Sequence, residues 1–187
     1  MEQETINTNH WYALRITYSR EMALKEFLDA EGIGNFIPMH YDYIRKGEHR
    51  VRRLVPVVHN LIFIYSTRQR LDVIKKEQEY RLPMRYIMNA ETRQPIVVPI
   101  KQMESFIAVA GTYDEQVVYL SPEEITLRKG MRVRINGGPF EGVEGVLMRV
   151  KNDRRVVVSI KGVMAVATHF IHPSLVTPIP EDALTDH

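Results

Sequence analysis

The sequence predicts an α+β fold in two parts: an antiparallel sheet flanked by helices, then a small five-stranded SH3-like β-barrel. Helix-period segments alternate with strand-like runs as far as residue 110, an acidic stretch follows, and short strands joined by tight turns fill the remainder. We therefore expect a disordered tail at 1–9, a first domain at 10–110, an acidic linker at 111–126, a barrel domain at 127–178 and an acidic tail at 179–187.

The first domain begins with an aromatic and aliphatic strand over 10–17. Ser19 is placed to cap a helix that runs to residue 31, where Gly32 ends it. Strand-like arms at 35–45 and 51–58 flank a basic turn at Gly47, which predicts a long hairpin with a basic tip.

The centre of the first sheet is predicted at residues 61–65, a continuous apolar run typical of a strand buried on both faces. After it, Thr67 can cap a helix that runs to about residue 79. Short strands at 84–88 and 96–98, and a helix from Pro99 to Gly111, complete the domain.

The barrel domain is predicted from strand-like runs and one loop that is rich in glycine and proline. Val133 and Ile135 alternate with Arg132 and Arg134, so this strand is half-buried. The loop Gly137-Gly138-Pro139-Phe140 is too rich in turn residues to be helical. Further strands are expected at 143–150, 155–160, 163–168 and 175–177, and a short one at 117–120 in the linker.

Positive charge is concentrated in two blocks of the chain, at residues 1–110 and 126–178. Residues 126–178 hold 9 Lys and Arg against 3 Asp and Glu, a net of +6, whereas residues 111–125 hold 4 acidic residues and no Lys or Arg. This segregation favours polyanionic partners. The alternative, that these side chains only keep exposed faces soluble, stays open for the residues before 111.

No catalytic or cofactor site is predicted. The chain has 0 Cys, and it lacks the glycine-rich phosphate loops and the nucleophile elbow. His169 and His172 are two ligands at most, so we expect neither a metal site nor enzymatic activity. No apolar run is long enough to span a bilayer, and residues 1–9 are polar, so we expect a cytoplasmic protein. We also expect it to be a monomer.

Three stretches together resemble the NusG family of transcription elongation factors. His10-Trp11-Tyr12-Ala13-Leu14 is similar to the Trp-Tyr opening of that family's amino-terminal domain, and Asn60-Leu61-Ile62-Phe63-Ile64 is similar to its Pro-(Gly/Asn)-Tyr-(Val/Leu)-Phe-Val strand. Residues 130–146 resemble its KOW motif. The sequence departs from the pattern at His59, where proline is usual, and at Leu61, where an aromatic residue is usual.

The resemblance implies an elongation or antitermination factor that binds the clamp helices of the largest RNA polymerase subunit. Residues 93–99 and 102–107 look most like the specialised paralogues of the RfaH/UpxY type, which control capsular-polysaccharide and similar long operons. The KOW domain would recruit a further partner, such as a ribosomal protein or a termination factor. The barrel is expected to be stable, although some relatives refold it into helices.

Three sets of residues are candidates for these roles. Aromatic and aliphatic side chains can anchor RNA polymerase, and cations can meet non-template DNA. The polymerase-binding set is Trp11, Tyr12, Asn60, Leu61, Phe63 and Tyr65; the nucleic-acid set is Arg15, Arg20, Arg68, Arg70 and Lys75; the recruiting set is Arg134, Gly138, Pro139 and Phe140.

Alternatives to these roles remain open at the level of sequence. Alternate residues of a strand point to opposite faces, so at most half of the aromatic set shares one surface, and Trp11 and Phe63 can equally be core residues. Phe140 is either an exposed anchor or a plug for the barrel end. An RNA-binding or ribosome-associated KOW protein that acts without RNA polymerase is the alternative function.

Overall fold

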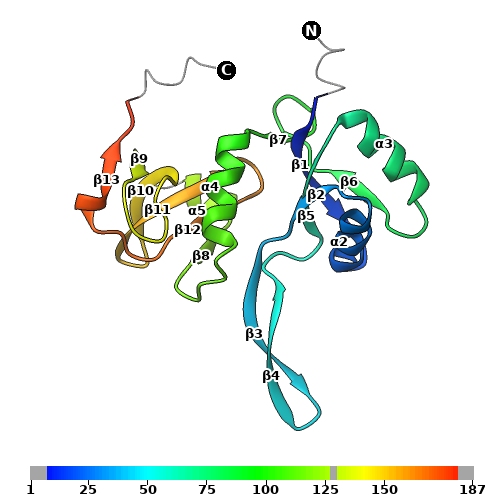
Figure 1. The fold of residues 1–187 in the computed structure, drawn as a ribbon, viewed down its shortest axis with the longest axis horizontal. Helices are drawn as coiled ribbons and strands as arrows, with labels where there is room; N and C mark the ends of the chain where they lie inside the picture. Colours follow the sequence, from blue (N-terminus) through cyan, green and yellow to red (C-terminus); the bar gives the residue numbers. More distant parts are fainter. Residues whose placement is uncertain (1–7, 127–129, 181–187) are drawn as a thin grey trace. The chain divides into compact units, whose positions relative to one another are not determined.

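The computed structural model describes residues 8–126 and 130–180, and the chain forms two compact units, Met1–Ile100 and Lys101–His187 (Figure 1). The first unit contains a five-stranded antiparallel sheet and a separate two-stranded ribbon, and the second contains a six-stranded antiparallel sheet. This confirms the predicted α+β class. Most of the tails expected at 1–9 and 179–187 lies outside the described residues.

The sheet of the first unit has the strand order β2 (Gly34–Phe36), β5 (Leu61–Ser66), β1 (His10–Ile16) and β6 (Met84–Tyr86). A further strand, β7 (Val97–Val98), also pairs with β1. The apolar run at 61–65 thus forms an inner strand, as its continuous hydrophobicity predicts.

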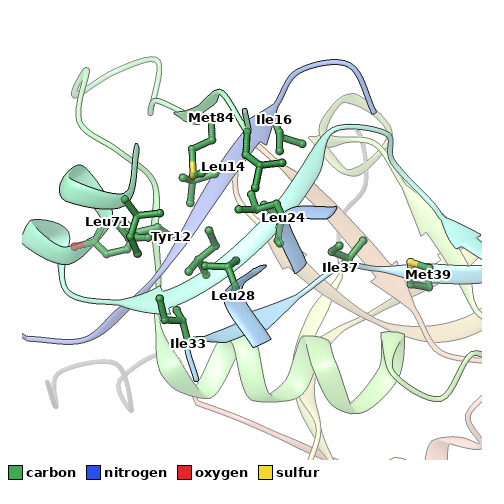
Figure 2. Packing of buried hydrophobic residues seen from close by; sticks show 14 residues of the cluster. Tyr12, Leu14, Ile16, Leu24, Leu28, Ile33, Ile37, Met39, Leu71 and Met84 are labelled. Carbon is green, nitrogen blue, oxygen red and sulfur yellow. The ribbon is translucent and has the colours of Figure 1, made fainter. Parts of the chain in front are cut away.

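One face of this sheet is covered by the helices α2 (Glu21–Ala30) and α3 (Arg68–Glu77). Leu24 and Leu28 of α2 and Leu71 of α3 are buried there among alternate residues of β1 and β5 (Figure 2). Side chains three or four residues apart on the helices thus pack against every second side chain of the strands in a single apolar layer.

The starts of the two helices differ from each other. Thr67 caps α3 as predicted, because its side chain accepts a hydrogen bond from the Arg70 N–H at 3.2 Å. Ser19 does not cap α2. It has a φ of +50°, its N–H donates to Asn60 Oδ1, and the helix begins two residues later without a side-chain cap.

The predicted hairpin is the ribbon of β3 (Met39–Lys46) and β4 (His49–Pro56), which extends away from the sheet of its unit (Figure 1). The ribbon is shorter than the predicted hairpin, because the start of the first predicted arm lies in residues 34–36, which pair with β5 instead. Pro38 separates β2 from β3, and proline has no N–H with which to continue a ladder. Gly47 makes the turn with a φ of +65°.

The second unit contains the five predicted barrel strands, in a sheet with the order β13-β9-β10-β11-β12-β8. Their bounds are β9 (Met131–Ile135), β10 (Glu144–Val150), β11 (Asp153–Ile160), β12 (Met164–Ala167) and β13 (Val176–Pro178), with the 3-10 helix η1 (Pro173–Leu175) before the last.

The segment expected to be a linker is structured over much of its length. Its strand β8 (Val118–Leu120) pairs with β12 and makes the barrel sheet six-stranded, and the short helix α5 (Pro122–Thr126) follows. Leu120 is buried with Val157 and Ala165, which explains why this stretch attaches to the barrel despite its acidic neighbours.

The helix α4 (Ile100–Ala110) falls almost entirely in the second unit, although we expected it in the first domain. Gln102 Nε2 donates to the Ser159 carbonyl, and Ser105 Oγ accepts from the Glu144 N–H at 3.2 Å. These two bonds from one helix face connect α4 to the barrel. Apolar periodicity predicted the helix but carried no information on these polar contacts.

Candidate functional site

An aromatic face lies on the side of the first sheet opposite α2 and α3. Directly paired residues of antiparallel strands share a face, and the register pairs Trp11 with Tyr65, Ala13 with Phe63, and Arg15 with Leu61. Trp11 and Tyr65 are partly buried, with ring centroids 5.3 Å apart, whereas Leu61 and Phe63 are fully buried. Four of the six predicted polymerase-binding residues are thus brought together.

Tyr12 does not belong to this face. It is 2% exposed and packs in the helix-covered core with Leu14 and Leu71 (Figure 2). Burial raises the pKa of the Tyr12 hydroxyl above its usual value. Its part in the Trp-Tyr opening is therefore structural, as the alternation of strand residues requires.

Asn60 supports the face from the turn before β5. Its φ is +66°, a conformation that glycine and asparagine adopt most readily. Its Oδ1 accepts from the Ser19 N–H at 2.8 Å, and its carbonyl accepts from the Ile16 N–H at 3.0 Å. This geometry explains why the resembling family motif has glycine or asparagine at the corresponding position.

The predicted nucleic-acid residues are spread over the unit, and several are engaged in contacts. Arg68 Nε lies 3.4 Å from Asp72, and Lys75 Nζ lies 3.7 Å from the same carboxylate. Both cations also lie over the Tyr86 ring, at 5.0 and 4.2 Å from its centroid. Burial, with the hydrogen bond to Asp72, raises the pKa of the Tyr86 hydroxyl.

The remaining three arginines have different surroundings. Arg20 donates to the Arg81 carbonyl at 2.6 Å, and Arg70 donates to the Glu31 carbonyl at 3.3 Å. Arg15 is exposed on the aromatic face, directly opposite Arg85 of β6, which is also exposed. Like charges paired across strands are unfavourable unless an anion lies between them, and sequence reasoning missed Arg85 because only the register reveals the pair.

In the barrel, the glycine-proline loop has the geometry of a tight turn. Gly138 has a φ of +80°, and a side chain there would meet nothing within 4 Å. Pro139 is exposed. Arg134 donates to Glu144 Oε1 through Nε at 2.9 Å and through a terminal nitrogen, so this arginine is paired across β9 and β10.

Phe140 is a plug and not an exposed anchor. It is 2% exposed, and its ring centroid lies 4.9 Å from that of His169. A side chain that must leave the core before it can bind a partner is a poor anchor, since exposing it forfeits its burial free energy. Of the two roles that the sequence leaves open for Phe140, burial therefore supports the plug.

Two exposed apolar side chains of the barrel were not singled out by sequence reasoning. Phe170 is 49% exposed and Leu175 is 38% exposed. An open groove of about 500 Å³ also lies between α4 and the loop at 141–144. Its charged and hydroxyl lining consists of Lys101, Glu104, Ser105, Arg134, Glu141 and Glu144.

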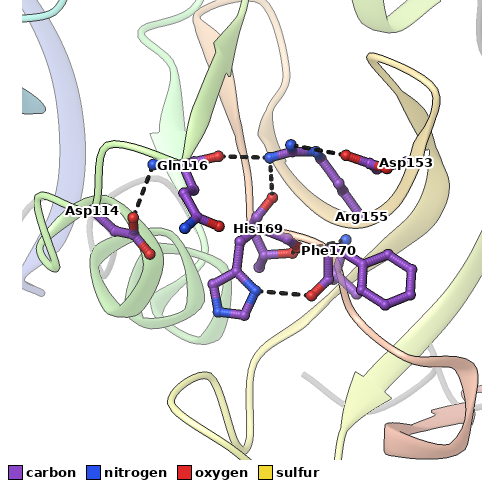
Figure 3. Close-up of polar contacts among 8 residues, drawn as sticks. Asp114, Gln116, Asp153, Arg155, His169 and Phe170 are labelled. Carbon is purple, nitrogen blue, oxygen red and sulfur yellow. Dashed lines mark hydrogen bonds and ion pairs between the residues drawn. The ribbon is translucent and has the colours of Figure 1, made fainter.

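The two barrel histidines make local contacts. His169 Nδ1 lies 2.8 Å from the Phe170 carbonyl (Figure 3), and His172 Nδ1 lies 2.8 Å from Ser174 Oγ at the start of η1. Across residues 8–126 and 130–180, no group of three His, Asp or Glu side chains is placed to hold a metal ion. Over the same ranges, none of the helices has the length and hydrophobicity to cross a membrane.

Comparison with known families assigns the chain. The family model described as "Transcription termination factor nusG" matches residues 9–127, more than half of the sequence. The chain belongs to the NusG family. Members of this family are non-enzymatic transcription factors that bind RNA polymerase, and membership indicates a role in elongation or antitermination. The match covers the aromatic face of the first unit and ends before the barrel strands β9 to β13.

Other comparisons add little to the NusG assignment. None of the curated proteins matches the chain. Among solved structures, the chain is similar to one described as "Domain interaction in Thermotoga maritima NusG", with 20% sequence identity and a TM-score of 0.43. That similarity covers 92% of this chain and 98% of the other.

Proposed function

We propose that this NusG-family protein is an elongation or antitermination factor whose first unit binds the clamp helices of the largest RNA polymerase subunit. The observation that carries the proposal is the partly exposed pair of Trp11 and Tyr65 above fully buried Phe63. Aromatic side chains held rigidly over a core are the usual anchors of protein interfaces, since little side-chain entropy is lost when they bind.

The partner that suits this face is an apolar helical surface. The face presents two aromatic rings over a framework of Ala13, Leu61 and Val98, all of which are buried. A coiled-coil tip offers aliphatic ridges at helical spacing, which large aromatic rings can cover. A holding contact of this kind would oppose pausing and termination by keeping the elongating enzyme closed.

Non-template DNA is the second proposed partner of the first unit. Arg15 and Arg85 face each other at the edge of the aromatic face, where a phosphate would relieve their repulsion. Arg20, Arg70 and Lys75 add positive charge on neighbouring elements, although backbone carbonyls and Asp72 already engage them.

We propose that the barrel recruits a further protein, with Phe170 as its apolar anchor in place of buried Phe140. Exposed Pro139 adds apolar surface, and the charged and hydroxyl side chains of the groove beside Arg134 can supply a polar margin, which is the usual build of a transient interface. A ribosomal protein or a termination factor is the expected class of partner.

We also propose that the protein is a specialised paralogue that acts on a polysaccharide-type operon. Residues 93–99 and 102–107 resemble the paralogues that act on polysaccharide-type operons, and they cover the approach to β7 and the first turns of α4. A gene next to such an operon is the genomic arrangement that this role predicts.

The alternative function, RNA binding by the barrel alone, relies on the basic block at 126–178. Two of its arginines have internal partners: Arg134 is paired with Glu144, and Arg155 is buried. The charge left for RNA is therefore lower than the sequence suggests, which favours the polymerase-dependent role.

In vitro transcription with purified RNA polymerase tests the proposed function. On a template with a known pause and a terminator, the protein should shorten the pause and raise the fraction of transcripts that read through. The comparison is the same template with Trp11→Ala protein, which should shorten the pause less and raise the fraction of read-through transcripts less. Unchanged pausing and termination at saturating wild-type protein would contradict the proposal.

A further inference from the structure

The turn that follows β9 contains a dipeptide whose chemistry the proposed function does not use. Of the seven asparagines in the chain, only Asn136 is followed by a glycine. A backbone nitrogen can attack the side-chain amide of the asparagine before it, and glycine crowds this approach least because it has no Cβ. The pair Asn136-Gly137 is therefore where such an attack meets the least steric hindrance in this chain.

Both reacting groups are accessible in the folded barrel. Asn136 is exposed and Gly137 is partly exposed, so water and hydroxide can reach them. Within residues 8–126 and 130–180, no hydrogen bond engages the Gly137 N–H, whereas the Asn136 N–H donates to the Leu175 carbonyl at 2.8 Å. The nitrogen that would attack can thus lose its proton to solvent without breaking a backbone hydrogen bond.

One contact restrains the asparagine side chain. Asn136 Nδ2 donates to Thr177 Oγ1 of the neighbouring strand β13, which holds the amide against that strand. Both residues are exposed, and an exposed hydrogen bond between side chains contributes little net free energy because water can replace either partner. The contact therefore slows the approach of Asn136 Cγ to the Gly137 nitrogen without preventing it.

We propose that Asn136 is a site of spontaneous deamidation, with water as its co-reactant. Hydroxide removes the Gly137 N–H proton, and the nitrogen attacks Asn136 Cγ to close a five-membered succinimide ring. The Cγ–Nδ2 bond breaks, and Nδ2 leaves as ammonia after taking a proton from water, which regenerates hydroxide. A water molecule then opens the ring at either carbonyl, which gives aspartate or isoaspartate. Nothing is oxidised or reduced, and the net change is one water consumed and one ammonia released.

The isoaspartate product lengthens the backbone inside a closed loop. Its chain runs through the former side-chain carbon, which inserts one methylene group between residues 136 and 137. The Gly142 N–H closes this loop by donating to the Ile135 carbonyl at 2.8 Å, and Phe140 is buried within it. Deamidation therefore loosens the turn that keeps Phe140 in the barrel. The reaction needs no partner protein, so it is independent of the proposed function.

Peptide mass analysis of the full-length protein, aged at mildly alkaline pH, tests the site. The peptide that contains Asn136 should split into two products, each about one dalton heavier, and their formation should be faster at higher pH. Asn152 is the internal reference, because it is exposed but is followed by Asp153, which has a side chain. It should stay unmodified over the same period. Equal rates at Asn136 and Asn152 would overturn the proposal.

Two variants test the roles of the neighbouring residues. Gly137→Ala should slow the reaction severalfold, and it should fold normally because its Cβ would lie 3.6 Å from Leu175 Cδ2, an ordinary van der Waals distance. Thr177→Val removes the restraint and should speed the reaction about fivefold, the factor that one ordinary hydrogen bond represents. An unchanged rate in Gly137→Ala would overturn the proposed attack, and an unchanged rate in Thr177→Val would overturn the restraint.

Hydrogen exchange tests the effect on the loop, with Asn136→Asp as the matched control. This variant introduces the carboxylate without lengthening the backbone, so its Gly142 N–H should exchange as in the wild type. The deamidated protein, separated by ion exchange, should contain a population in which the Gly142 N–H exchanges at least about fivefold faster. Wild-type exchange throughout the deamidated protein would show that isoaspartate does not loosen the turn.

Discussion

Trp11 and Tyr65 are directly paired across β1 and β5, and their rings lie 5.3 Å apart with 39° between their planes. This separation is within the range in which aromatic rings attract each other. The same register places Tyr12 beneath the helices. A shift of one residue would exchange the two faces, so the pairing itself determines which side chains can reach a partner.

The turn at Asn60 should tolerate glycine better than a β-branched residue. Asn60→Gly keeps the positive φ and loses the bond from the Ser19 N–H, at a cost of about 1 kcal/mol. Asn60→Val adds backbone strain of roughly 1–3 kcal/mol. Urea unfolding of both variants measures the difference, and equal stability of the two would show that the turn is not strained.

Phe140 and Phe170 should respond in opposite ways to truncation. Phe140→Ala removes a fully buried ring and should destabilise the second unit by roughly 3–5 kcal/mol. Phe170→Ala removes a half-exposed ring and should cost less than about 1 kcal/mol. Thermal unfolding of the two variants measures both effects. A stable Phe140→Ala barrel would mean that this ring does not plug the core.

Arg155 should hold the segment before β8 onto the barrel. Its guanidinium donates to the Gln116 carbonyl at 2.6 Å and to the Thr168 carbonyl at 2.8 Å (Figure 3). Arg155→Met leaves both carbonyls without this donor and should cost about 2–4 kcal/mol. Hydrogen exchange should rise at β8.

The neighbouring Arg154→Met is the matched control for that variant, because Arg154 is exposed. It should change stability by less than about 0.5 kcal/mol. If hydrogen exchange at β8 stays the same in Arg155→Met, Arg155 does not hold this segment.

Stability should fall at alkaline pH, in part through Tyr119. Burial raises the pKa of this hydroxyl from 10.0 to about 12. The folded chain therefore holds the proton more tightly than the unfolded chain, so the stabilisation is complete below pH 10 and is lost as pH rises toward 12.

The free energy of unfolding measured between about pH 8 and pH 11 tests this, with Tyr119→Phe as the comparison. The variant cannot ionise at this position and should lose less stability than the wild type over that interval. The pKa values of Tyr12 and Tyr86 are also raised, so these two residues cause part of the loss of stability in both proteins. An identical loss in both proteins would contradict the assignment to Tyr119.

Local sequence pattern predicted the strands and helices well, because hydrophobic period is a local property. The apolar run at 61–65, the cap at Thr67 and the barrel strands at 131–135 and 143–150 all have close counterparts in the structure. The family motifs also predicted the correct family, as the match of the family model to residues 9–127 shows.

Features that depend on contacts distant in sequence were not predictable in this way. Burial of Phe140 depends on its contact with His169, 29 positions later in the chain, and the pair of Arg15 and Arg85 depends on strand register. The association of α4 with the barrel depends on two hydrogen bonds with partners about 40 and 60 residues away. Periodicity carries no information on any of these.

The most direct test of the central claim is the affinity of purified RNA polymerase for the wild-type protein and for Trp11→Ala. Trp11 is an anchor of the proposed interface, so the variant should bind at least about tenfold more weakly while its unfolding temperature shows that it remains folded. Tyr80→Ala, which removes an exposed aromatic ring outside the sheet, should bind as the wild type does. Equal affinity of folded Trp11→Ala and wild-type protein, or no binding by the wild type, would contradict the account.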